Sequence, residues 1–174
     1  MLDAIAARTP APGGGSATAC ATALAASLVE MATSFAPVPD ASFARAGQLR
    51  TRALELAEME LHAYEPVLEA LRLPRDDPQR ADRVAAAEAE ASRSPLELAQ
   101  VSAELAELAA DIAQAGNPNL SGDAIAGALL AEAAAQAAAR LVRINLADGP
   151  KVDEAADHAR RASAARERAL AVGG

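Results

Sequence analysis

Hydrophobic positions along the chain recur at the three-to-four-residue spacing of α-helices, and no segment shows the strict alternation of a β-strand. Proline and glycine clusters divide this pattern into about six helices, which follow a short first segment ending at Thr9-Pro10. The expected helices span residues 16–34, 41–73 with a bend at Pro66, 77 onward, 94–116, 124–146 and 151–171. The sequence therefore predicts an all-α fold, a helical bundle that forms a single domain over residues 1–174.

Capping residues mark several of the expected helix starts. Ser16 follows three glycines and is a natural N-cap, while Asp77-Pro78 and Ser94-Pro95 each place proline at the first helical position. A loop before residue 124 carries four polar side chains: Asn117, Asn119, Ser121 and Asp123. Caps and Asx-turns account for one or two of these four, so the others are candidate ligand contacts.

Alanine fills 51 positions and aromatic residues make up 2% of the chain, which strengthens the helical prediction because alanine is the best helix former. Each alanine buries little apolar area, however, so a monomer gains little hydrophobic stabilisation. Association of Ala-rich helix faces would add burial. We therefore expect a homodimer or a larger homo-oligomer.

Charge and cysteine content exclude several classes of protein. The net charge is −8 and Lys151 is the only lysine, which argues against nucleic-acid or anionic-membrane partners. The most apolar segment, residues 124–142, carries charged and amide side chains, so we expect no membrane span. A single cysteine, Cys20, and no secretory signal favour the cytoplasm.

Glu60 interrupts the apolar face of the expected helix 41–73, whose other acidic residues lie on the opposite face. A carboxylate on an apolar face is desolvated, so its pKa should rise and it would suit proton transfer. A structural carboxylate paired with an arginine of a neighbouring helix explains the pattern equally well.

Asn145 is a similar exception, because it lies beside Leu141 and Val142 rather than on the polar stripe of its helix. It is either a ligand contact or an amide that satisfies carbonyls near a helix end. The turn Gly13-Gly14-Gly15 before Ser16 allows close backbone approach of a ligand, with a positive φ expected at Gly14, or it is a flexible turn. His62 and His158 fall on polar helix faces with no clustered ligands around them, so we expect no metal site.

Four stretches of the chain, in order, carry a family resemblance. They are residues 5–16 (IAARTPAPGGGS), 60–74 (ELHAY…LEALRLP), 116–123 (GNPNLSGD) and 141–146 (LVRINL). Together they resemble the cyclodeaminase/cyclohydrolase family, which acts on folates. The resemblance implies an all-helical dimer with a tetrahydrofolate site in a groove by the subunit interface, and no metal or redox cofactor.

The same resemblance implies the site residues. Those in catalytic positions are Glu60, Asp123 and Asn145. Those in substrate-binding positions are Thr9, Pro10, Gly13, Gly14, Gly15, Ser16, Asn117, Asn119 and Arg143. The implied reaction is cyclodeamination of 5-formiminotetrahydrofolate, or alternatively hydrolysis of methenyltetrahydrofolate.

Four positions depart from the family pattern. Glu60 stands in place of an aspartate, Gly122 in place of a serine and Leu141 in place of an asparagine. Residues 34–39 replace a basic stretch. A catalytically weak folate-binding relative and a purely structural helical protein therefore remain competing hypotheses at this point.

Overall fold

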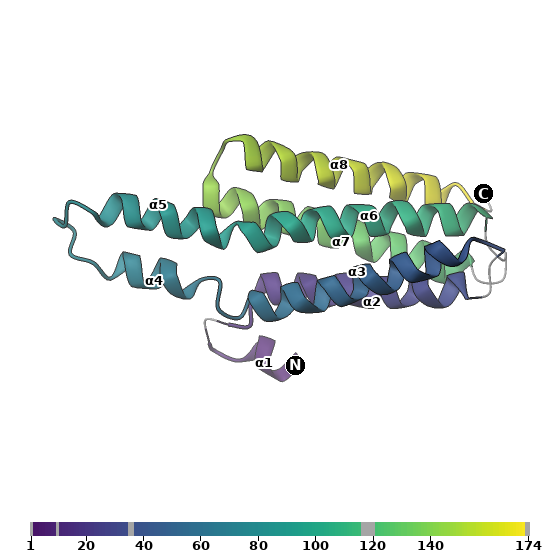
Figure 1. Cartoon of the computed structure of the whole chain (residues 1–174), viewed down its shortest axis with the longest axis horizontal. Coiled ribbons are helices and arrows are strands. Elements are labelled where there is room, and N and C mark those ends of the chain that lie inside the picture. Colours follow the sequence, from purple (N-terminus) through teal and green to yellow (C-terminus); the bar gives the residue numbers. More distant parts are fainter. Residues whose placement is uncertain (1, 10, 35–36, 116–120, 173–174) are drawn as a thin grey trace.

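The computed structural model describes residues 2–9, 11–34, 37–115 and 121–172, and every regular element in these ranges is a helix. The elements in chain order are α1 (Leu2–Ala6), α2 (Gly14–Thr33), α3 (Asp40–Met59), α4 (Glu65–Leu71), α5 (Arg80–Ala91), α6 (Arg93–Ala115), α7 (Ser121–Leu146) and α8 (Pro150–Leu170). Figure 1 shows them along the length of the molecule. The all-α prediction is confirmed.

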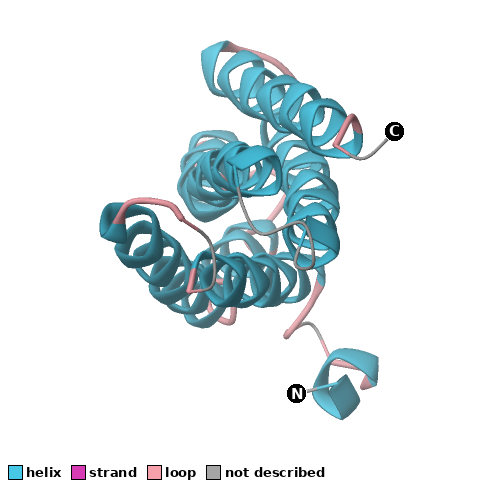
Figure 2. Cartoon of the chain, turned by 90° about the vertical axis from the view of Figure 1, so that its right-hand side faces the viewer, coloured by secondary structure: helices cyan, strands magenta, loops and turns pink. Residues whose placement is uncertain are grey.

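The long helices α2, α3, α6, α7 and α8 lie side by side in an elongated bundle (Figures 1 and 2). Helix α6 runs through its centre and packs against each of the other four. Helices α4 and α5 pair with each other and extend past the end of the bundle where α2 begins and α7 ends. The α4–α5 pair meets the end of the bundle where α2 begins and α7 ends at the turn after α3.

Small side chains let α2 and α7 pack closely. A Cβ atom on Gly127 of α7 would lie 2.8 Å from Val29 Cγ2 and 3.3 Å from the carbonyl oxygen of Ala25, both on α2. At the other end of the pair, Gly14 approaches Leu141. The two helices are therefore antiparallel, and the glycine-rich start of α2 lies beside the last turns of α7.

Three expected boundaries were wrong. Asp77-Pro78 does not open a helix, because α5 begins at Arg80 after Gln79, and both residues lie in the turn before it. The helix expected over residues 41–73 is two helices, because α3 ends at Met59 and Pro66 lies in the first turn of α4, where its missing amide hydrogen costs no helical bond. Ser16 does not cap α2, because the helix already begins at Gly14 after Gly13. Ser16 instead donates a 3.3 Å hydrogen bond from Oγ to the carbonyl oxygen of Ala57, tying α2 to α3.

Helices α2 and α7 are long and apolar enough to pass a composition test for membrane spans. Both also bury residues along their length against neighbouring helices of the bundle. Core helices of water-soluble proteins pass the same test, so the match in composition is weak evidence for a membrane span.

Candidate active site

Glu60 directly follows α3 and lies against the first turn of α2. A Cβ atom on Gly15 would collide with Glu60 Oε2 and would come within 3.0 Å of its Cγ. Gly15 is therefore the residue whose missing side chain makes room for this carboxylate. The expected desolvation of its carboxyl is present, although Glu60 lies just past the end of α3 rather than within a continuous helix.

Burial raises the pKa of the Glu60 carboxyl, and the nearby Ser94 hydroxyl opposes part of this rise. Neither Glu60 Oε1 nor Ser94 Oγ has a hydrogen-bond partner of regular geometry in the described part of the chain, although both atoms are buried. No arginine is among the groups that shift this pKa, so the alternative of a structural ion pair has no support here. The predicted direction of the pKa shift is confirmed.

A cleft of about 290 Å³ lies beside Glu60. It is lined by Glu60, Ala63 and Tyr64 from the turn after α3, Glu88 and Ala91 from α5, Pro95 from α6, and Leu141, Ile144 and Asn145 from α7. The fold thus brings Glu60 and Asn145 together, although they are far apart in the sequence. Asn145 Nδ2 donates a 3.3 Å hydrogen bond to the carbonyl oxygen of Ala91, so this amide also ties α7 to the end of α5.

The glycine turn enters α2 beside the cleft. Gly13 precedes the helix and provides no side-chain cap, and the first amide to bond within the helix is that of Ala17, which donates to the Gly13 carbonyl oxygen at 3.0 Å. The amides of residues 14–16 therefore point out of the helix N-terminus, an end that attracts negative or polar groups. The positive φ expected at Gly14 was wrong, because Gly149 is the only positive-φ glycine in the described ranges.

The remaining expected site residues lie elsewhere. Thr9 is exposed between α1 and α2, and Pro10, Asn117 and Asn119 lie outside the described residues. Asp123 is in the first turn of α7, 22 residues before Asn145, which separates the two by about 33 Å along the helix. One chain therefore does not bring Asp123 into the cleft with Glu60.

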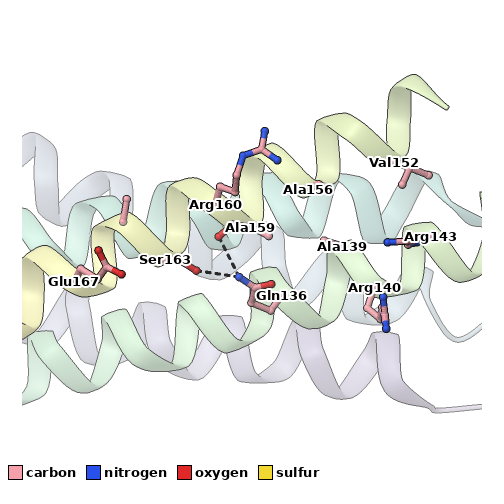
Figure 3. A pocket seen from close by; sticks show the side chains of 11 residues that line it. Gln136, Ala139, Arg140, Arg143, Val152, Ala156, Ala159, Arg160, Ser163 and Glu167 are labelled. Atoms are coloured by element: carbon pink, nitrogen blue, oxygen red, sulfur yellow. Dashed lines mark hydrogen bonds between the residues drawn. The ribbon is translucent and has the colours of Figure 1, made fainter. Parts of the chain in front are cut away.

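Arg143 lies on the opposite side of α7 from Asn145, in a groove between α7 and α8 (Figure 3). Among the residues that the structure describes, no group of three or more histidine, cysteine, aspartate or glutamate side chains could hold a metal ion. His158, expected on a polar face, is instead buried beside Arg161, with 3.2 Å between Nδ1 and Arg161 Nη1.

The sequence model of the family described as formiminotransferase-cyclodeaminase matches residues 1–166. The chain belongs to this family. No match is found among curated protein sequences.

A cyclodeaminase-family fold is also evident from a solved structure. The formiminotetrahydrofolate cyclodeaminase of Thermotoga maritima superimposes with a TM-score of 0.84 and 24% sequence identity, over 97% of this chain and 90% of that one. At this identity the likeness shows the shared fold.

Ser94 is the site residue of this cyclodeaminase-family chain that sequence reasoning missed. The Ser94-Pro95 pair was interpreted as a helix start, but α6 begins at Arg93 and Ser94 is 5% exposed within its first turn. Its proximity to Glu60 joins residues 34 positions apart, so no local spacing pattern contains that information.

Proposed function

We propose that this protein is a formimidoyltetrahydrofolate cyclodeaminase, which converts 5-formiminotetrahydrofolate to 5,10-methenyltetrahydrofolate and ammonia. The observation that carries the proposal is the Glu60 carboxyl, which is desolvated, has no arginine partner among the described residues and lies at the edge of a cleft shared with Asn145. Both residues belong to stretches through which the chain resembles its family. A carboxyl with a raised pKa is suited to take up and return a proton near neutral pH.

The reaction needs one proton to move between two nitrogens. N10 attacks the carbon of the protonated formimino group and loses its own proton as the N10–carbon bond forms. The same proton is then delivered to the formimino nitrogen, which leaves as ammonia when its bond to the tetrahedral carbon breaks. We assign both transfers to Glu60, whose raised pKa favours holding the proton between the two steps.

Neighbouring groups in the cleft would orient the substrate. Asn145 supplies an amide oxygen in addition to the Nδ2 group that bonds to Ala91, and the N-terminus of α2 supplies outward-facing amides. These neutral groups can hold polar edges of a pterin ring without competing for the proton. The proposed chemistry uses neither a metal ion nor a redox cofactor.

We further propose that the protein acts as a homodimer in the cytoplasm. Helices α2 and α7 carry exposed apolar side chains, among them Leu24 at 58%, Leu129 at 42% and Met31 at 42% exposure. A two-fold dimer buries the same patch on both subunits. If α7 pairs antiparallel with its counterpart, the partner's Asp123 would approach the cleft that contains Glu60. This arrangement would explain why Asp123, an expected site residue, lies far from Glu60 within one chain.

The decisive experiment is a turnover assay with purified protein and 5-formiminotetrahydrofolate, measuring release of ammonia together with formation of the methenyl product. We expect both products in equal amounts. A parallel assay of methenyltetrahydrofolate hydrolysis tests the alternative, because water addition passes through a tetrahedral carbon between the same two nitrogens. Folate binding without either turnover would favour a catalytically weak relative, and absence of binding would favour a structural role.

The dimer is tested separately by light scattering at micromolar concentration. We expect twice the mass of one chain for the parent and a shift towards one chain for Leu24→Glu. A parent that remains a single chain would contradict the dimer and leave the position of Asp123 unexplained.

A further inference from the structure

A groove of about 490 Å³ runs between α7 and α8 and is separate from the Glu60 cleft. Its lining residues are Gln136, Ala139, Arg140, Arg143, Val152, Ala156, Ala159, Arg160, Ser163, Ala164 and Glu167. Figure 3 shows Gln136 in the middle, where its Nε2 bonds to Ser163 Oγ at 2.9 Å. The groove therefore combines an apolar surface of alanines and valine with three arginines.

Two of these arginines have no acidic partner in the part of the chain that the structure describes. The side chains of Arg140 and Arg143 form no hydrogen bond or ion pair within the described ranges, although acidic residues outnumber basic ones by 24 to 16 in this chain. By contrast, Arg161 of α8 binds both carboxylate oxygens of Glu107 at 2.9 Å. Unpaired guanidinium groups on an acidic protein are well placed to bind an added carboxylate.

The groove and the cleft meet across the end of α7. Leu141 and Ile144 line the cleft, while Arg140 and Arg143 line the groove. Arg140 and Ile144 are four residues apart and so lie on one side of the helix, and the Ile144 side chain is 71% exposed. A ligand that reaches from the cleft to the groove therefore crosses one exposed surface of α7. The diameter of a helix with its side chains is about 10–12 Å.

We propose that the groove binds the carboxylates of the substrate's glutamate tail through Arg140 and Arg143, while the pterin ring lies in the Glu60 cleft. This inference rests on the proposed function and identifies the part of the substrate that each cavity takes. The p-aminobenzoyl ring crosses the exposed Ile144 surface, and its apolar faces match that side chain. The two carboxylates of the tail match the two unpaired guanidinium groups.

The first test is direct binding of p-aminobenzoylglutamate, measured by calorimetry on the parent, on Arg140→Gln/Arg143→Gln and on Arg75→Gln. Arg75 is an exposed arginine in the turn between α4 and α5, so its variant loses charge far from the groove. We expect affinity to fall about 10-fold or more in the double variant, as for loss of charge-assisted hydrogen bonds. Arg75→Gln should bind like the parent.

The second test uses steady-state kinetics with 5-formiminotetrahydrofolate. The double variant should raise KM about 10-fold with kcat nearly unchanged, because the tail is bound equally in the ground and transition states. Binding of 6-methyltetrahydropterin, which has no tail, should be the same in all three proteins. Both arginines are exposed, so the melting temperature should hardly change.

The two proposals fail in different ways. If p-aminobenzoylglutamate does not bind to the parent, or binds equally to the parent and the double variant, the tail site is wrong even when turnover is normal. If it binds in the groove while 5-formiminotetrahydrofolate is not converted, the reaction assigned to Glu60 is wrong and the anion site stands.

Discussion

Gly15 and Glu60 are in direct contact, with the glutamate carboxylate occupying the space that a side chain on Gly15 would fill. The neighbouring Gly14 is different, since a Cβ there would have only Leu141 Cδ2 near it, at 4.0 Å. Of Gly14 and Gly15, the latter is therefore the one that sets the position of the proposed catalytic carboxyl.

Gly15→Ala should reduce kcat strongly and stability only slightly. The added methyl group must displace the end of the flexible Glu60 side chain, which costs little free energy of folding. The displacement moves the carboxyl by about an ångström or more from its reactive position. We expect kcat to fall about 100-fold, as for a misplaced reacting group. Gly14→Ala is the matched control, and both variants should be compared by turnover and by thermal melting. Equal activity in the two variants would show that the position of Glu60 is not critical.

Glu60→Gln should bind folate normally and lose about 10²–10⁴-fold in turnover, the usual contribution of general acid–base catalysis. The amide keeps the size of the side chain and removes the titratable proton. Glu60→Asp restores the family's usual side chain, so we expect it to keep activity or increase it. Parental turnover by the Gln variant would reduce Glu60 to a buried structural group.

The stability of the parent relative to Glu60→Gln should depend on pH. Because burial raises the Glu60 pKa in the folded state, the folded protein binds this proton more tightly than the unfolded chain does. The resulting stabilisation is complete below the unfolded pKa and is lost as the pH rises through the folded pKa. Melting curves should therefore show that the melting temperature of the parent rises relative to that of the Gln variant as the pH falls from neutral towards 4. A pH-independent difference would contradict the assigned burial.

Ser94→Ala should move the acidic limb of the kcat/KM profile to higher pH. The Ser94 hydroxyl lowers the Glu60 pKa, so its removal leaves the effect of burial unopposed, and ionised Glu60 is the form that accepts the N10 proton. Ser94→Thr retains a hydroxyl and should restore the parental profile. Ser102→Ala removes a buried hydroxyl that bonds to Thr22 at 2.8 Å, and it should lower the melting temperature without moving the limb. An unmoved limb in Ser94→Ala would remove Ser94 from the site.

Asn145→Leu should abolish most turnover and also cost about 1 kcal/mol of stability, the usual net value of one hydrogen bond. The loss of stability is expected because Asn145 Nδ2 donates a hydrogen bond to the Ala91 carbonyl oxygen, which gives this amide a structural role as well. Turnover and chemical denaturation measure the two effects separately. Full activity in a destabilised variant would leave only the structural role.

The local sequence is enough to predict the helices, most of their ends and the desolvation of Glu60. Alanine content and helical spacing specify helices, and prolines and glycines specify where most of them begin and end, because these effects act within a few residues. The desolvated state of Glu60 also follows from its apolar neighbours, although the helix that suggested it ends at Met59. The order of the family motifs along the chain identified the family, which the match over residues 1–166 confirms.

Only the tertiary structure decided which of these residues meet. The contact of Gly15 with Glu60, the proximity of Ser94 and the pairing of Glu60 with Asn145 in one cleft depend on how far each helix slides along its neighbour. The same packing keeps Asp123 away and turns Arg143 towards α8. Helical periodicity fixes the direction of a side chain around its own axis, but the height at which two Ala-rich helices pack depends on contacts between residues distant in sequence.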